Sequence, residues 1–70
     1  MPILTVSDIR FAFEAMHEAQ RVEMEGRFRL TADPTSDVIA QEVALAAETA
    51  KALTLRFTIL FADYRRQHGD

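Results

Sequence analysis

The sequence predicts an all-α fold, in which two helices form an antiparallel hairpin and two hairpins dimerise into a four-helix bundle. Three observations lead to this prediction. Residues 35–67 contain neither Gly nor Pro, so one long helix can run without interruption. Apolar residues recur along that helix with the heptad spacing of helices packed side by side. The chain is also too small to build a large core by itself, which favours self-association.

The length of the chain limits both its domain count and its stability. A domain of 70 residues buries only roughly 60% of the surface that its unfolded chain exposes, so we expect a single domain over residues 1–70. The sequence contains no Cys, which excludes disulfides and thiolate metal sites. Oligomerisation and very regular helix packing remain as the ways to reinforce the fold. We therefore expect a homo-oligomer, and a dimer in the simplest case.

The first predicted helix covers about residues 7–25. Ser7 suits the N-cap position, and Asp8 places a negative charge at the positive end of the helix dipole. Glycine commonly follows the last residue of a helix, so we expect the first helix to stop before Gly26.

The segment after the first helix is predicted to be a connector over residues 26–33. Charged and apolar residues alternate over residues 27–31, which indicates an extended segment whose Phe28 and Leu30 close one end of the core. The same pattern allows an alternative α+β fold with a small β-hairpin at residues 22–30.

The second predicted helix covers about residues 34–66. Asp33 suits the N-cap position, and Pro34 suits the first helical position, where its missing N–H costs nothing. Arg65 and Arg66 place positive charge at the negative end of the dipole. A short connector between two helices makes them antiparallel neighbours.

A heptad pattern on the second helix predicts the core. Its members are spaced alternately three and four residues apart, which is the pattern of helices in a left-handed supercoil. We call this set the core seam: Ile39, Val43, Ala46, Ala50, Leu53, Phe57, Leu60 and Tyr64.

A second set of apolar residues recurs every seven positions on a different face of the same helix. We call it the second row: Val38, Leu45, Ala52 and Ile59. One neighbouring helix cannot cover both the core seam and the second row, and the apolar residues of the first helix also spread over most of its circumference. The excess apolar surface predicts a protein partner or a second copy of the chain. The predicted partner interface comprises Phe11, Val22, Val38, Leu45, Ala52, Leu55 and Ile59.

One pair of residues suggests metal chemistry. Glu14 and His17 have the Glu-x-x-His spacing that places both side chains on one helix face, as in carboxylate-bridged di-iron bundles, so a metal-binding bundle is an alternative function. Both residues lie on the polar arc of the first helix, however, which favours a solvated face. We expect no metal and no other cofactor. A two-helix chain offers no cleft for a catalytic group, so we expect no catalytic residue and no enzymatic activity.

Arginines near the first helix suggest a second alternative, an RNA-binding helical-hairpin dimer that uses Arg21, Arg27 and Arg29. Glutamates are interleaved with these arginines, and the net charge of the chain is -3. General affinity for phosphate backbones requires clustered Lys and Arg, so we expect no nucleic-acid partner.

The N-terminus and the longest apolar stretch indicate where in the cell the protein is expected. The N-terminus lacks the basic start and long apolar run of a secretory signal. Residues 52–62 are interrupted by Arg56 and fall short of the ~20 residues needed to cross a bilayer. We expect a cytoplasmic protein-interaction module or small regulator that acts by helix packing, against itself or against a partner protein.

Overall fold

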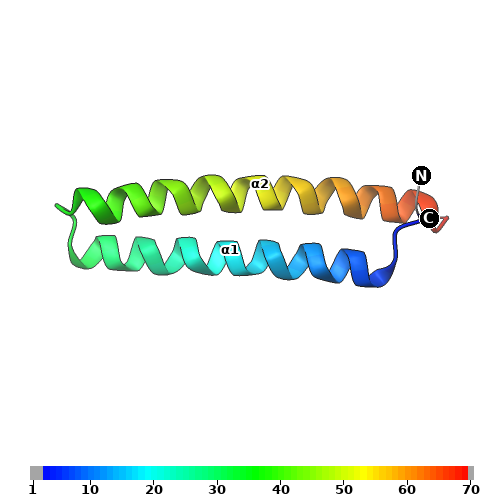
Figure 1. Ribbon diagram of the computed structural model, residues 1–70, viewed down its shortest axis with the longest axis horizontal. Helices are drawn as coiled ribbons and strands as arrows, with labels where there is room; N and C mark the ends of the chain where they lie inside the picture. The colour runs from blue at the N-terminus through cyan, green and yellow to red at the C-terminus, as the bar shows by residue number, and fades with distance from the viewer. Residues whose placement is uncertain (1–2, 70) are drawn as a thin grey trace.

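The computed structural model describes residues 3–69. Within them the chain forms two helices, α1 (Val6–Ala32) and α2 (Asp37–Gln67), which run antiparallel along their whole lengths (Figure 1). The predicted all-α class and the packing of two helices against each other are confirmed. No strand occurs in residues 3–69, so the alternative β-hairpin at residues 22–30 is wrong.

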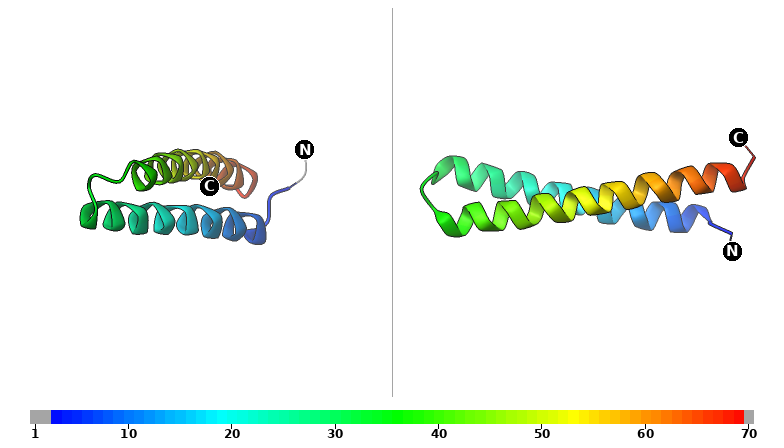
Figure 2. Two further views of the ribbon diagram at one scale, coloured as in Figure 1. Left: turned by 60° about the vertical axis from the view of Figure 1, so that its left-hand side comes forward. Right: turned by 90° about the horizontal axis from the view of Figure 1, so that it is seen from above.

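The molecule is a thin rod. Its principal extents are 51 × 17 × 14 Å, and its radius of gyration is 15.7 Å, against roughly 11 Å for a compact domain of this length. Seen from above, the helices cross near the middle of their lengths (Figure 2). This crossing is the geometry that a heptad pattern produces.

α1 begins one residue before the predicted start. Thr5 is the N-cap: its Oγ1 accepts a hydrogen bond from the backbone N–H of Asp8 at 3.3 Å. Asp8 Oδ2 accepts a bond from the backbone N–H of Thr5 at 2.8 Å, which completes a capping box. The predicted N-cap, Ser7, is therefore wrong, because only Thr5 has the acidic residue three positions later that this motif requires.

α1 continues through Gly26 to Ala32, so the predicted connector over residues 26–33 is wrong for all but its last residue. Gly26 is buried against α2, where a Cβ atom would lie 3.0 Å from Val43 Cγ2. The glycine thus allows a close approach of the two helices and does not end α1. As a result Phe28 lies on the outside of a helix, 79% exposed, and does not close the core as predicted, whereas Leu30 is half-buried.

The connector is the short segment 33–36. Asp33 donates its backbone N–H to the carbonyl of Arg29 at 3.0 Å and so caps the end of α1. Ser36 is the N-cap of α2, and its Oγ accepts a bond from the backbone N–H of Ile39 at 3.2 Å. The predicted cap at Asp33 and Pro34 is wrong, because both residues are used in the turn itself.

The core lies between the two predicted heptad faces. Every residue of the core seam is buried or half-buried, which confirms the seam as the inward face of α2. α1 presents a matching set with the same spacing of three and four: Ile9, Ala12, Met16, Ala19, Glu23, Gly26 and Leu30. The buried hydrophobic residues are mostly small, namely Ala12, Met16, Ala19, Val43 and Ala50, and no large side chain in residues 3–69 is fully buried. Close helix packing therefore comes with a thin core.

Candidate protein-binding surface

The second row lies on the outside of α2. Leu45, Ala52 and Ile59 each follow a core-seam residue by two positions, which turns them by roughly 200° away from it. The structure leaves the row uncovered, with Leu45 71% and Ile59 54% exposed. Val38, at the start of α2, is 66% exposed. The second row therefore forms an apolar stripe on the solvent-exposed side of α2.

Leu55 broadens this stripe in the second half of α2. It lies three residues after Ala52 and four before Ile59, so the three side chains are neighbours on the helix surface. Leu55 is 61% exposed. The structure therefore places Leu55 together with the second row on one face of α2.

The two predicted interface residues of α1 lie on the flank of the hairpin that borders that face. Phe11, 75% exposed, lines a hollow of about 320 Å³ at the open end of the hairpin, together with Leu4, Leu53, Arg56 and Leu60. Arg56 lies four residues after Ala52, so this hollow borders the second row.

Val22 is also exposed and lies closer to the connector. It precedes Arg29 by seven residues and therefore shares a flank of α1 with it. Arg29 pairs with Glu42 of α2 at 2.6 Å across that flank. Glu42 precedes Arg56 by two heptads, so Val22 lies on the same flank of the hairpin as Arg56, beside the second row.

Two opposite charges border the second row. Glu48 lies three residues after Leu45 and four before Ala52, and Arg56 lies four after Ala52 and three before Ile59. Neither forms an ion pair with any other residue of the described chain. Both charges are available to a molecule that covers the row.

Sequence reasoning missed an aromatic cluster on the other flank of the hairpin. Phe13 meets Phe57 edge-on, with ring centroids 5.6 Å apart, and Phe61 stacks on Phe57 at 5.7 Å. Phe13 and Phe61 remain 47% and 40% exposed. Their positions next to the two heptad faces were visible in the sequence, but the contact between them depends on how the two helices are aligned.

Phe28 and Met24 form a second surface that sequence reasoning did not identify. Met24 is 70% exposed, and the two side chains are neighbours one turn apart on the outside of α1. The sequence predicts an extended connector at Phe28, and in an extended segment the helical spacing to Met24 does not apply.

The residues proposed for metal binding show no ligand arrangement. His17 stacks on Phe13, with ring centroids 6.1 Å apart. Across residues 3–69, no group of three or more His, Cys, Asp or Glu side chains is placed to hold a metal ion. Glu14 and His17 are both exposed, as expected for a solvated helix face.

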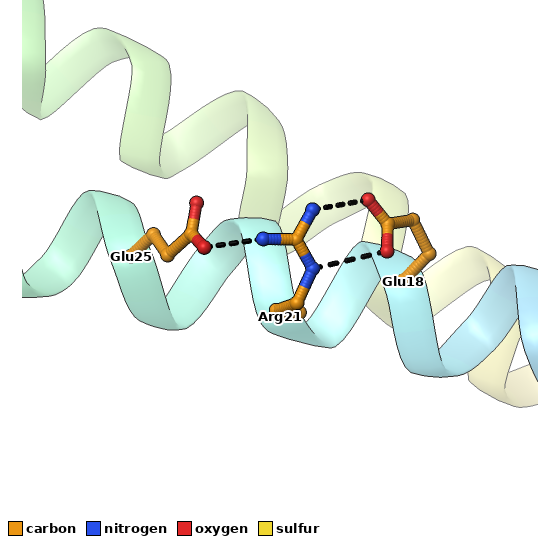
Figure 3. Close-up of polar contacts among 3 residues, drawn as sticks. All are labelled: Glu18, Arg21 and Glu25. Carbon is orange, nitrogen blue, oxygen red and sulfur yellow. Dashed lines mark hydrogen bonds and ion pairs between the residues drawn. The ribbon is translucent and has the colours of Figure 1, made fainter.

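The arginines proposed for RNA binding are engaged with carboxylates. Arg21 lies between Glu18 and Glu25 and bonds to both, with its Nε 3.0 Å from a Glu18 carboxylate oxygen (Figure 3). The Arg21 hydrogen bond holds the pKa of Glu18 below its ordinary value of 4.5.

Arg27 bonds to Glu23 at 2.6 Å, and Arg29 bonds to Glu42. Each of the three arginines proposed for RNA binding thus has a carboxylate partner. Bound in this way, they do not form a free basic surface.

Comparison of the chain with protein-family models, curated proteins and solved structures finds no match. Neither α1 nor α2, as described, combines the length and the apolar character needed to cross a membrane.

Proposed function

We propose that this protein is a small protein-interaction module that acts by packing the second row of α2 against a helix of another protein molecule. The observation that carries the proposal is the exposure of Leu45, Leu55 and Ile59 on one face of a well-capped helix. Apolar side chains spaced by three, four and seven residues are the usual anchors of helix–helix recognition.

The amount of exposed surface supports this proposal. The molecule exposes 5510 Å², whereas a compact monomer of 7.9 kDa exposes roughly 4,400 Å². The excess of about 1,100 Å² exceeds the roughly 800 Å² that each partner buries in a standard protein–protein interface. A bound helix would cover this excess where it is most apolar.

The energetics of the second row also favour a partner. Full burial of one Leu or Ile side chain contributes about 1.5–3 kcal/mol, so three such residues can offset much of the cost of association. Glu48 and Arg56 at the edge of the row would set partner choice and association rate more than affinity.

The charge arrangement favours protein over RNA as the partner. A nucleic acid would have to displace the carboxylates that already bind Arg21, Arg27 and Arg29. The second row, in contrast, is covered by nothing in the hairpin.

A capture experiment tests the proposal. The tagged chain is used to capture proteins, including untagged copies of itself, from an extract of the native host. We expect Leu45→Glu and Ile59→Glu to keep their helicity and to lose the captured proteins, because each introduces a charge into the contact. Thr58→Glu, at an exposed position of α2 outside the row, is the control. Equal capture by the wild type and both row variants would overturn the proposal.

A further inference from the structure

We propose that the two ends of the chain form a clasp that keeps the hollow beside Phe11 shut. In this clasp, side chains at the end of α2 hold the segment before α1, which we call the strap: Ile3, Leu4 and Thr5. The inference goes beyond the proposed function and does not depend on which molecule covers the second row.

The clasp binds both backbone polar groups of one residue. The N–H of Leu4 donates to Gln67 Oε1 at 2.7 Å. His68, with its ring proton on Nε2, donates to the carbonyl oxygen of Leu4 at 2.9 Å. The strap leads from the start of α1 towards the end of α2, at the end of the rod away from the connector (Figure 1). The hairpin is therefore closed at both of its ends.

His68 is itself held in place at the end of α2. Its backbone N–H donates to the carbonyl of Tyr64 at 3.0 Å, and its ring packs against the Tyr64 ring with centroids 4.2 Å apart. Gly69 follows with a φ of 81°, in the left-handed region that glycine adopts without strain and that commonly ends a helix. The imidazole ring is therefore already positioned to meet the strap.

The strap forms one wall of the hollow. Ile3 and Leu4 line it together with Phe11 of α1 and with Leu53 and Leu60 of the core seam. Leu4, Leu53 and Leu60 are each half-buried. Release of the strap would therefore expose apolar surface at the end of the core seam.

The clasp is weaker than the helices that it joins. It consists of two hydrogen bonds between exposed groups, whereas α1 and α2 are held by their backbone bonds and by the core between them. Parts of a protein with few buried contacts and exposed hydrogen bonds open at a lower free energy than the whole molecule. The strap can therefore release while the two helices stay packed, and the hollow then opens beside the second row.

Hydrogen exchange tests whether Gln67 holds the strap. Gln67→Met removes the acceptor at similar side-chain size, whereas Gln67→Glu keeps an acceptor oxygen. We expect NMR to show the Leu4 amide exchanging about two- to tenfold faster in Gln67→Met than in the wild type, as for the loss of one hydrogen bond. The amide should exchange no faster in Gln67→Glu than in the wild type. Equal exchange rates in the wild type and Gln67→Met would overturn the clasp.

Thiol labelling tests whether the strap closes the hollow, since the chain has no native Cys. With Leu60→Cys as the reporter, we expect added Gln67→Met to raise the rate of alkylation by iodoacetamide about two- to tenfold, because the strap opens more often. Leu53→Cys, in the same hollow, is a second reporter, and circular dichroism checks that both reporters are folded.

Ser36→Ala, added to the same reporters, is the matched control. It removes the N-cap hydrogen bond at the other end of α2, about 36 Å from residue 60, and so destabilises the hairpin without changing the strap. We expect it to leave the labelling rate unchanged.

The outcomes separate a local clasp from general unfolding. Labelling that rises equally in Ser36→Ala and Gln67→Met would show that the hollow opens only when the whole hairpin unfolds, and the proposal would then be wrong. Faster exchange of the Leu4 amide without faster labelling would show that the strap does not cover the hollow. None of these outcomes changes the proposed function, which the capture experiment with the Leu45 and Ile59 variants tests separately.

Discussion

Gly26 has a structural role that its residue type alone does not suggest. A glycine inside a helix costs about 1 kcal/mol relative to alanine, yet α1 runs through it for six further residues. The compensation comes from α2, whose Val43 packs on the bare Cα of the glycine. The two helices can therefore lie closer together here than a side chain at residue 26 would allow.

Replacement of this glycine gives a first prediction. We expect Gly26→Ala to lower Tm despite the better helix propensity of alanine, because β-branched Val43 has one preferred rotamer in a helix and cannot move Cγ2 away. In a Val43→Ala background the clash is absent, and Gly26→Ala should raise stability. A double-mutant cycle measured by urea unfolding should give a coupling of about 0.5–3 kcal/mol. Additive effects would contradict this account of the contact.

At the scale of the helix, the N-terminal ends of α1 and α2 are determined by side chains that accept hydrogen bonds from the first free backbone N–H groups. Thr5 and Ser36 do this, whereas Ser7, which lies inside the first turn of α1, does not. A capping residue satisfies a donor that would otherwise lack a partner within the helix.

The choice of cap predicts a difference between two similar substitutions. We expect Thr5→Ala to destabilise the protein by about 1 kcal/mol, because it removes the acceptor for the Asp8 N–H. Ser7→Ala should change stability by less than about 0.5 kcal/mol and serves as the matched control. Thermal unfolding of both variants measures the difference, and a larger loss for Ser7→Ala would restore the capping position expected from the sequence.

The charges along α1 predict a pH response. The pKa of Glu18 is lowered by its hydrogen bond from Arg21, so this ion pair stabilises the folded helix at neutral pH. Its contribution is lost as the pH falls through the lowered pKa. We expect an NMR titration to show Glu18 titrating below 4.5, and Arg21→Gln to move its midpoint upward. An unchanged midpoint in the variant would show that Arg21 does not stabilise the carboxylate.

At the scale of the whole molecule, stability depends on a core of small residues within a long, thin rod. Such a core tolerates little disruption, because few other contacts hold α1 to α2. The apolar residues on the outside of α2 contribute nothing to this contact in a single hairpin.

Two leucines of α2, one in the core seam and one on the outside of the helix, test whether only the inward face stabilises the hairpin. Leu53 is half-buried in the core seam, and we expect Leu53→Asp to unfold the chain, because an unpaired charge in an apolar core costs several kcal/mol. Leu55, 61% exposed, lies two residues further on, and Leu55→Asp should retain the helical circular dichroism signal. Phe57→Asp should behave like Leu53→Asp. Full helicity and an unchanged Tm in Leu53→Asp would show that the core seam does not form the core.

The sequence was sufficient to predict two antiparallel helices, because a short connector makes consecutive helices antiparallel neighbours. Its periodicity was sufficient to predict the core seam and the exposure of the second row, which follow from 3.6 residues per turn and require no knowledge of the neighbouring helix. The exposed interface residues of α2 could be identified for the same reason. Their function as an interface stays a prediction.

Only the tertiary structure decided where α1 ends and which residues its last two turns expose. Local propensity favours a stop at Gly26, but the contact of this glycine with Val43 exists only once the two helices are packed, and it outweighs the local cost. The same packing decides that Phe28 lies in solvent and that Phe13 meets Phe57. Contacts between residues far apart in the chain determine these features, so no pattern within a single helix could have predicted them.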